Sequence, residues 1–503
     1  MFYSNDRRQS NDVSALAITA AGLFFFTPTA FGQGAPGISP ATLGQAVPVT
    51  ATPAESAANA AAGVAASTVW DMPKTIAAAL ASSSDLANAL RAVQIDNKSA
   101  DEAAAAARPN ASVSGSATNF DSATRVTFGP STFKVMGDNT QTLAINLSNQ
   151  LDVTGKVHAQ VDQVKLQSQA DMYDAQRIRN ARILRAQTIY YNLLRSRHQV
   201  SVAQASLTNA QTQLATAKSL NAGGVGQKID LLRANTQVAE AQQSLTQAVN
   251  TAAVAEACFN NLVRQPLKTP VSVQDVPGAA VGTTITNATS VGAPTPDMML
   301  FAPPIDEVGK IDLDQSMQTA DANRPEILEA QALVTADRLG IRLAHAGLEP
   351  TFTISAGGFY YPTTSFQNPR RQVGEVTADV VLPLYDGGAT RDRMSEARLQ
   401  TQDAEASLSS AHTDVALDVQ QTYLNVVTAA HQIDAANSAL QQAIAARQLA
   451  QIRYEGQVGL YLEVTDAESA LVDAQSNQVN AVYDYQIARA QFLNALGTPF
   501  TGQ

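Results

Sequence analysis

The fold of this chain is decided by residues 389–455, which read ATRDRMSEARLQTQDAEASLSSAHTDVALDVQQTYLNVVTAAHQIDAANSALQQAIAARQLAQIRYE. This stretch of 67 residues contains neither Gly nor Pro, which cost about 1 and about 3 kcal/mol inside a helix. Apolar side chains recur every seven residues at Val419, Val426, Ile433 and Leu440, a spacing typical of a coiled-coil contact. The stretch therefore predicts a single helix, roughly 100 Å long.

Three other parts of the chain share this freedom from Gly and Pro. They run over Lys156–Asn221, Gln227–Gln265 and Leu460–Leu496, with 66, 39 and 37 residues. A long run and a short run therefore follow each other twice, each time across a brief segment that contains Gly. We expect two pairs of helices, over 156–265 and 389–496, that pack as coiled coils rather than as a globule.

Short segments of alternating polarity precede each pair of long helices. In the segment QTLAINLSNQ (141–150), Leu143, Ile145 and Leu147 share one face and the residues between them share the other. A period of two is typical of a β-strand with one apolar face. The same reasoning predicts strands near 111–120, 351–361 and 374–383. A short amphipathic helix over about 74–107 is expected before the first strand.

The two halves of the chain repeat the same order of elements. Residues 72–109 align with 313–350 at an offset of 241, and residues from 151 onward align with a later copy at an offset of 233. The difference in offset falls between the two strands of each half, where a hairpin tip tolerates a change of length. We expect a first repeat over 70–265, a connector over 266–312 and a second repeat over 313–503.

The first 69 residues have a different character. Arg7 and Arg8 stand ahead of the apolar run Val13–Phe26, and small residues follow at Ala30 and Gly32. This order is typical of a secretory signal, which we place at 1–32. Residues 33–69 are rich in Ala, Pro and Thr and are expected to form a flexible leader. No later segment reaches 18 consecutive apolar residues, so no transmembrane helix is expected.

Composition argues against several classes of protein. The chain of 503 residues has a formal net charge of −11, which argues against nucleic acid as a partner. Its single cysteine, Cys258, rules out an internal disulfide, and we expect a small buried residue there rather than a reactive thiol. The five histidines lack metal-ligand spacing, and no nucleophile elbow, phosphate loop or catalytic carboxylate pair is recognisable. We predict neither an enzyme nor a cofactor.

Four strands of about ten residues have the length that crosses a bilayer when tilted, but they are too few to close a barrel. Because open sheet edges are forbidden in lipid, other copies of the chain must complete the sheet. The predicted fold class is mainly α with a small β part. A long α-helical coiled-coil tunnel continues from four transmembrane strands per chain, and three chains form a twelve-strand barrel. Asp379 alternates with the apolar face of its strand and is expected in the barrel lumen.

Several motifs, present in order and in two copies, carry a resemblance to a known family. They are ARPNASVSGS and GLEPTFTISAGG at the first strand of each half, LDVTGKV and LPLYDGGAT where strand passes to helix, AGGVGQKIDLLRA and RYEGQVGLYLEVTDA at the helix turns, and the closing FLNALGTPF. From Trp70 to Phe500 the chain resembles the TolC-type outer-membrane efflux proteins. The resemblance implies a homotrimer in the outer membrane of a Gram-negative cell, with a helical tunnel in the periplasm.

The resemblance also implies a function and partners. A protein of this kind is a passive exit duct of a tripartite efflux system or a type I secretion system. It docks on a periplasmic adaptor (membrane fusion) protein and an inner-membrane pump. The residues leave a second interpretation open, which is a secreted coiled-coil adaptor or surface structural protein without a pore. Four strands of bilayer length favour the channel, because an adaptor does not need them.

In proteins similar to this chain, acidic side chains of three subunits form rings where the tunnel narrows at the turn of the second helix pair. The matching residues are Glu463 and Asp466, which share one helical face. The first half has Asp230 and Arg233 at these positions. Crowded carboxylates would bind cations and raise one another's pKa. The alternative for such an acidic pair is a solvated helix face.

The resemblance gives one further residue a role at this turn. Tyr454 matches a tyrosine that helps to hold the inner helices closed through hydrogen bonds. Gly459 stands where some members of the family have an arginine, so a different or weaker latch is expected. Plain packing at a helix end is the alternative interpretation of Tyr454.

Overall fold

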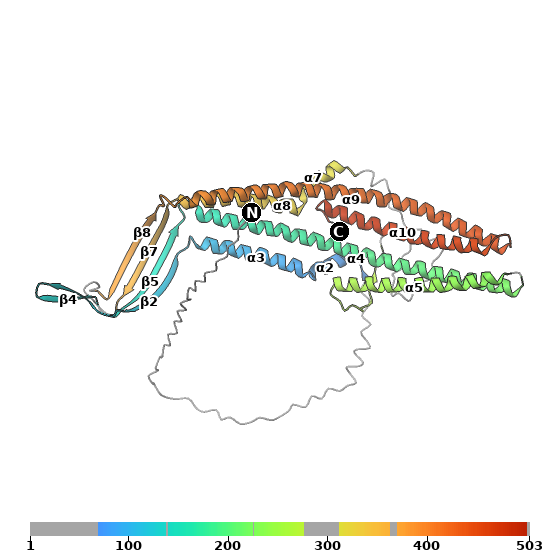
Figure 1. The fold of residues 1–503 in the computed structure, drawn as a ribbon, viewed down its shortest axis with the longest axis horizontal. Coiled ribbons are helices and arrows are strands. Elements are labelled where there is room, and N and C mark those ends of the chain that lie inside the picture. The colour runs from blue at the N-terminus through green and yellow to red at the C-terminus, as the bar shows by residue number, and fades with distance from the viewer. Residues whose placement is uncertain (1–68, 137–138, 225, 276–310, 363–369, 500–503) are drawn as a thin grey trace, which may run out of the picture. The chain divides into compact units, whose positions relative to one another are not determined.

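The computed structural model describes residues 69–136, 139–224, 226–275, 311–362 and 370–499. The expected signal at 1–32, nearly all of the leader at 33–69 and most of the connector at 266–312 lie outside these residues. All elements described below belong to one unit of the chain, residues 65–503. They follow each other in the same order in both halves of the sequence (Figure 1).

Each half has two short helices, two strands and a pair of long helices. In the first half these are α2 (Met72–Ala81), α3 (Ser84–Ala105), β2 (Asn110–Asn119), β5 (Asn139–Leu151), α4 (Lys156–Ala222) and α5 (Lys228–Leu262). In the second half they are α7 (Leu313–Asn323), α8 (Pro325–His345), β7 (Thr351–Tyr360), β8 (Gln372–Val381), α9 (Ala389–Glu455) and α10 (Tyr461–Ala495). The predicted fold class, mainly helical with four strands, is confirmed.

The helix expected over about 74–107 is in fact two helices, because the chain breaks at Ser82 and Ser83. Ser83 has an extended backbone, and its side-chain oxygen accepts the Leu86 N–H at 3.2 Å, so it caps α3. In the second half Pro325 opens α8 at the position aligned with Ser84, where a proline removes no helical hydrogen bond. Serine and proline therefore start the corresponding helix by different chemistry.

The four strands form one antiparallel sheet in the order β2-β5-β7-β8. In β5, Leu147 lies opposite Ala111 of β2 on one side and opposite Ala356 of β7 on the other. β7 pairs in turn with β8. Within the described residues β2 and β8 each pair with one strand only. Both edges of the sheet therefore carry unpaired backbone groups.

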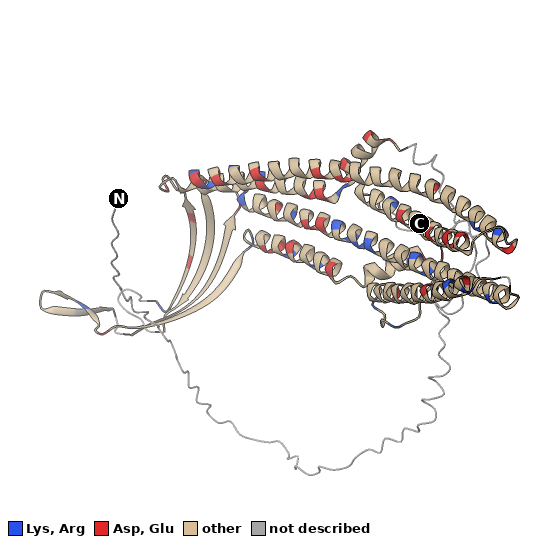
Figure 2. Ribbon diagram, turned by 45° about the vertical axis from the view of Figure 1, so that its right-hand side comes forward, with Lys and Arg blue, Asp and Glu red and all other residues tan. Residues whose placement is uncertain are grey.

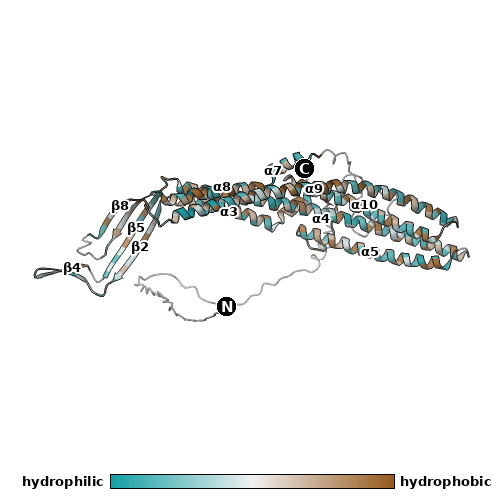
Figure 3. Cartoon of the chain, turned by 45° about the horizontal axis from the view of Figure 1, so that its top comes forward, coloured by the Kyte–Doolittle hydropathy of each residue, from teal (hydrophilic) through white to brown (hydrophobic). Residues whose placement is uncertain are grey.

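The register of the strands gives the sheet one apolar face and one polar face. On the apolar face, Leu143, Ile145 and Leu147 of β5 are 48%, 59% and 48% exposed. The same face holds Ala111, Val113, Phe352, Ile354, Ala356, Val376 and Val380. The opposite face holds Ser112, Asn146, Ser148, Thr353, Ser355, Thr377 and Asp379. Apolar and polar residues accordingly alternate along the strands (Figure 3).

Two strand pairs were not expected from the sequence. A hairpin of β3 (Thr124–Phe128) and β4 (Ser131–Met136) occupies the loop between β2 and β5. Gly129 in its turn has φ +58°, which glycine adopts without strain. β1 (Val69–Trp70) pairs in parallel with β6 (Ser272–Val273) and so ties the start of the connector to the start of the first repeat. Segments of two residues carry no period from which such a pair could be predicted.

The seven-residue repeat of α9 forms the core of the second helix pair. Val419, Val426, Ile433 and Leu440 are between 0% and 5% exposed, as the coiled-coil spacing predicts. The first three pack in one cluster with aromatic residues of α10. A single face of α9 therefore makes the contact that holds this pair together.

A second cluster joins helices from both halves of the sequence. Tyr190 and Leu193 of α4 pack with Phe259 of α5 and with Tyr483 of α10. Because α10 comes from the second half, this cluster connects the two repeats. In the part of the chain that the structure describes, no helix is both long and apolar enough to cross a membrane.

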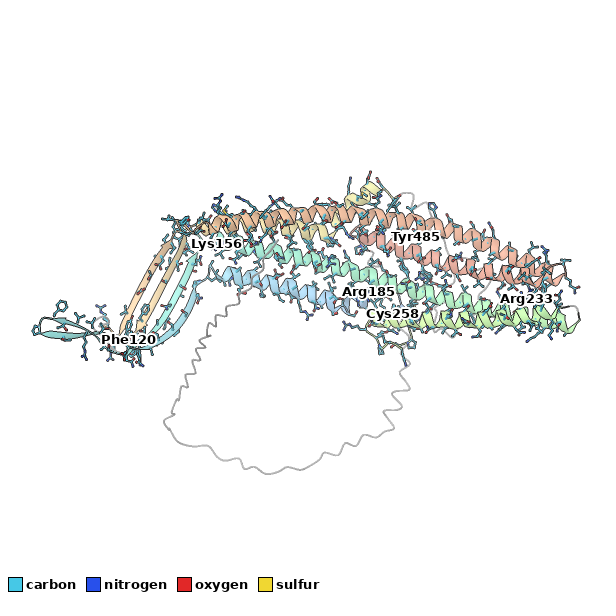
Figure 4. The ribbon with its side chains drawn as sticks, viewed as in Figure 1. Phe120, Lys156, Arg185, Arg233, Cys258 and Tyr485 are labelled. Carbon is cyan, nitrogen blue, oxygen red and sulfur yellow. The ribbon has the colours of Figure 1, made fainter. Side chains whose placement is uncertain are left out.

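The expectation of a buried residue at Cys258 is wrong. Cys258 is exposed on α5, where Figure 4 labels it. The next residue, Phe259, is fully buried. Successive residues of a helix point about 100° apart, so the face that buries Phe259 turns the cysteine away from the core.

The strands pass into the long helices within a few residues. Gly155 and Gly388 stand directly before α4 and α9 and have φ of 74° and 93°, a region that side chains disfavour. The carboxylate of Asp152 accepts the N–H groups of Val157 and His158 at 3.0 Å and so caps α4. Each long helix therefore starts at a fixed point close to the sheet.

Candidate functional site

The two helix turns lie at the end of the long helices that is remote from the sheet. Figure 4 shows Lys156 at the sheet end of α4 and Arg233, near the start of α5, at the other end. Ala217 and Ala234 of the first pair pack in one cluster with Ala450, Tyr454 and Tyr461 of the second. The turn between α4 and α5 and the turn between α9 and α10 therefore lie side by side (Figure 1).

Each turn depends on a glycine that folds back against the preceding helix. Gly226 donates its N–H to the Leu220 carbonyl and Gly459 donates to the Arg453 carbonyl, both at 2.9 Å. A Cβ added at Gly459 would lie 2.9 Å from Cβ of Arg453 and 3.1 Å from its carbonyl carbon. The turn therefore has no room for an arginine at position 459.

Two tyrosines pack together at the second turn. Tyr454 lies in the last turn of α9 and is 7% exposed, Tyr461 opens α10 and is 2% exposed, and their ring centroids lie 5.3 Å apart. The Tyr461 hydroxyl donates to Oε1 of Gln237 in α5 at 3.2 Å. Burial raises the pKa of Tyr461 to about 12, so the hydroxyl keeps its proton at physiological pH. This bond links the second helix pair to the first.

The expected latch residue, Tyr454, therefore packs against the residue that makes the bond to the first helix pair, Tyr461. Tyr454 makes no side-chain hydrogen bond to any residue that the structure describes. Tyr461, which the resemblance did not indicate, makes the bond between the helix pairs. Both lie in the motif RYEGQVGLYLEVTDA, but only the packing of the turn shows which hydroxyl reaches the first pair.

The three acidic residues of the expected constriction have different surroundings. The Glu463 carboxylate lies 3.7 Å from a guanidinium nitrogen of Arg453, and both side chains are partly exposed. Asp466 is exposed and forms no ion pair with any described residue. Asp230 of α5 is close enough to Tyr454 to raise the pKa of its phenol, in addition to the larger effect of burial. The structure thus brings Asp230 to the tyrosines and leaves Asp466 free.

A further carboxylate near this end is buried between three helices. Glu468 of α10 is 2% exposed. It accepts a hydrogen bond from Nδ2 of Asn209 in α4 at 2.8 Å and one from Nε of Arg447 in α9 at 3.1 Å. A carboxylate buried without such partners would be costly. The sequence did not single out Glu468. It lies five residues beyond Glu463, so the two side chains do not share a helical face.

The polar face of the sheet carries the other expected site residue. Asp379 of β8 lies on this face, opposite Thr353 of β7. Glu375, which was not singled out from the sequence, lies on the same face and accepts a hydrogen bond from Oγ1 of Thr377 at 3.2 Å. The strands otherwise carry few charges (Figure 2). Among the described residues no group of three or more His, Cys, Asp or Glu side chains could hold a metal ion.

An amphipathic four-stranded sheet at one end of long, paired helices is the architecture of an outer-membrane channel protein. The family model described as "Outer membrane efflux protein" matches residues 75–262 and 317–498, one stretch in each half. The chain belongs to this family, and the predicted TolC-type membership is confirmed. The predicted location in the outer membrane of a Gram-negative cell is confirmed with it. Membership of a family of efflux proteins also agrees with the prediction that the chain is not an enzyme.

Relatives of known identity are similar to part of the chain. It is 27% identical over 188 residues to the outer membrane protein TolC of Vibrio cholerae and 24% identical over 194 residues to TolC of Escherichia coli. Each alignment covers 36% of this chain, and 43% and 39% of those proteins. The chain therefore matches less than half the length of either. It is also 28% identical over 183 residues to the toluene efflux pump outer membrane protein TtgI of Pseudomonas putida, covering 35% of this chain and 38% of that protein.

Solved structures are similar over most of the chain. CusC matches with a TM-score of 0.68 at 18% identity, covering 85% of this chain and 92% of CusC. VceC of Vibrio cholerae matches with a TM-score of 0.66 at 20% identity, covering 85% of this chain and 96% of VceC. At these identities the similarity establishes the fold alone.

Proposed function

We propose that this protein is the outer-membrane channel of a tripartite efflux or type I secretion system, a passive exit duct across the periplasm and the outer membrane. One observation carries the proposal. It is the sheet whose apolar face is exposed, whose other face is polar and whose two edges are unpaired among the described residues. A sheet of this kind is stable in lipid only when further copies complete it.

The dimensions of the strands suit a bilayer. β2, β7 and β8 have 10 residues each and β5 has 13, against about 9–11 for a tilted transmembrane strand. Three copies would supply twelve strands, with β8 of one chain beside β2 of the next. Leu143, Ile145 and Leu147 would then face the lipid, and Asp379 and Glu375 would line the lumen. A homotrimer is therefore part of the proposal.

The long helices would continue the lumen through the periplasm. α4 and α9 have 67 residues each, or roughly 100 Å, and both start within a few residues of the sheet. Three chains would place six such helices around one axis. This arrangement supports a tunnel whose remote end is closed or opened at the helix turns, where a periplasmic adaptor and an inner-membrane pump would dock.

We place the constriction at Glu463 and Asp466, with Asp230 beside it. Asp466 is the strongest contributor in this proposal, because its carboxylate is free while Arg453 partly neutralises Glu463. Three copies of Asp466 around an axis would form an acidic ring that attracts multivalent cations. Tyr454 packs against Tyr461, and the bond from Tyr461 to Gln237 acts as the latch between the helix pairs.

The second interpretation was a secreted coiled-coil adaptor or surface structural protein without a pore. It accounts for the helices but not for the sheet. A protein in water would bury the face that holds Ile145 and Val376, which are 59% and 79% exposed in the chain. The membrane channel gives these side chains a lipid environment, so we prefer it.

The test is the conductance of the purified full-length protein in planar lipid bilayers. We expect small, cation-selective channels that multivalent cations block from the periplasmic side. Asp466→Asn should weaken the block more than Glu463→Gln does, because only Asp466 lacks a partner. Glu396→Gln is the charge-matched control, because Glu396 is exposed near the sheet end of α9 and should leave the block unchanged.

The outcomes separate the parts of the proposal. Channels that lose the block in Asp466→Asn support both the duct and the ring. If the cation block is the same in all three variants, the constriction does not lie at these residues of α10. Well-folded protein without conductance, recovered as a soluble monomer, would overturn the duct.

A further inference from the structure

A polar cavity of about 390 Å³ lies where α2 and α3 meet the end of α5. Its wall includes the serines at the break between α2 and α3, Asp85 in the first turn of α3, and Arg182 of α4. Asn261 of α5, with Arg264 and Gln265 just beyond that helix, completes the wall. This cavity lies apart from the helix turns and from the sheet.

Positive charge gathers at this cavity. Arg182 and Arg264 line it. The pKa of Arg182 is lowered, first by burial and then by the charges of Arg185 and Arg264. Asp85 is the one carboxylate in the wall. Within the described residues none of the three arginines forms an ion pair, and Arg182 instead donates to the carbonyls of Ala79 and Leu262 at 3.1 and 3.2 Å.

At the corresponding place in the second half, carboxylates of the same chain neutralise the positive charge. Arg324, which aligns with Ser83, has guanidinium nitrogens 3.2 Å from Glu326 and 3.0 Å from Asp418. Its side chain is 12% exposed. One buried cation is therefore balanced by two carboxylates of the same chain.

The aligned residues show that positive charge is in excess at the corresponding place in the first half. Asp418 aligns with Arg185, Gly497 with Arg264 and Val415 with Arg182, all at the offset of 233. The same part of the fold thus holds three arginines and one carboxylate in the first half. Two of these arginines, Arg185 and Arg264, are exposed, so an anion from solution can reach the unbalanced positive charge.

The cavity offers donors that suit an oxyanion. The guanidinium of Arg264 forms no hydrogen bond or ion pair with a described residue, and its planar donors match carboxylate and phosphate oxygens. The N–H groups of Ser84 and Asp85 belong to the first turn of α3 and have no acceptor within the helix. We propose that this cavity is a binding site for a small oxyanion, a phosphate or carboxylate group of a solute, held between Arg264, Arg182 and the start of α3.

The backbone provides a variant that removes the charge without disturbing the fold. Arg264 has φ +55°, a region in which a side chain is strained, and the aligned residue is Gly497 with φ +74°. Arg264→Gly therefore copies the second half and relieves strain. Arg233→Gln is the charge-matched control, because Arg233 is exposed near the start of α5, roughly 45 Å from Arg264, which lies just past the other end of that helix.

The experiment is calorimetric titration of the detergent-purified full-length protein with inorganic phosphate and, separately, with acetate, at constant ionic strength. We expect saturable binding of at least one of these anions, with one site per chain. Arg264→Gly should weaken binding about tenfold or more, Arg233→Gln should not change it, and Asp85→Asn should tighten it by removing the repelling carboxylate.

The preferred anion identifies the chemistry of the solute, because phosphate and acetate are titrated separately. The proposal is overturned if neither anion binds the native protein saturably. It is equally overturned if Arg264→Gly and Arg233→Gln bind alike. Neither reading depends on whether the protein conducts ions, so this test stands apart from the test of the channel.

Discussion

Glu468 offers the sharpest test of how the helix pairs are held together near their turns. The substitution Glu468→Ala removes a carboxylate that is 2% exposed and accepts hydrogen bonds from Asn209 and Arg447. A hydrogen bond to a charged group is worth about 1.5–3 kcal/mol, and removing one partner of a buried ion pair costs about 3–5 kcal/mol. The side chain of Arg447 is 26% exposed, so water can reach the orphaned guanidinium. We therefore expect a loss of about 3 kcal/mol, at the low end of that range.

The assay is guanidinium unfolding of the detergent-purified protein, followed by helical circular dichroism. Glu468→Gln keeps the size and one acceptor and should lose only about 1–2 kcal/mol. The double variant with Arg447→Ala should lose less than the sum of the single losses, because both remove the same ion pair. Asp473→Ala is the control, since Asp473 is exposed on the same helix and should change stability by less than about 0.5 kcal/mol. Equal losses in Glu468→Ala and Asp473→Ala would refute the reasoning.

Three further predictions concern the turn between α9 and α10 and the contact between α3 and α4. Gly459→Ala should lower the apparent unfolding temperature, because its Cβ would lie 2.9 Å from Cβ of Arg453, and overpacking of this kind costs about 1–3 kcal/mol; a temperature equal to that of the native protein would contradict the close approach. Gln457→Gly should stabilise the protein by about 1 kcal/mol and so raise its unfolding temperature, because Gln457 has φ 60°, where a side chain is strained; a lower unfolding temperature would show that the Gln457 side chain contributes more than the strain costs. A hydrogen bond with Asp96 raises the pKa of Asp171 to about 6. The folded protein therefore holds a proton that the unfolded chain releases, and this contribution to stability is present at low pH and is lost as pH rises through about 6. Asp171→Asn should accordingly stabilise the protein at about pH 7.5 but not at about pH 4, as measured by thermal unfolding at both pH values; equal effects at both would remove Asp171 as the cause.

The comparison of the two halves shows how a repeat can keep its fold and change its chemistry. Ser83 and Arg324 occupy aligned positions before the same helix. The serine caps that helix and lines a cavity, while the arginine pairs with Glu326 and Asp418. Differences of this kind escape a search for the repeat, because the repeat is recognised by what the halves share.

The sequence by itself determined the four long helices and the four strands of the main sheet. The absence of Gly and Pro from residues 389–455, the step of seven from Val419 to Leu440 and the alternation around Ile145 are each set by neighbours along the chain. Such patterns fix helix, strand and buried face, because backbone propensity and side-chain direction are local properties. The face of β8 that carries Asp379 follows from the same alternation.

Only the tertiary structure decided which residues meet. The bond from Tyr461 to Gln237 joins residues 224 positions apart, and the bond from Asn209 to Glu468 joins residues 259 apart. The exposure of Cys258 and the cluster of arginines at the cavity depend in the same way on how each helix is rotated about its axis. A rotation of a few tens of degrees leaves the local period unchanged but brings other side chains into contact, because the heptad pattern specifies a stripe of contact and not the partner opposite each residue.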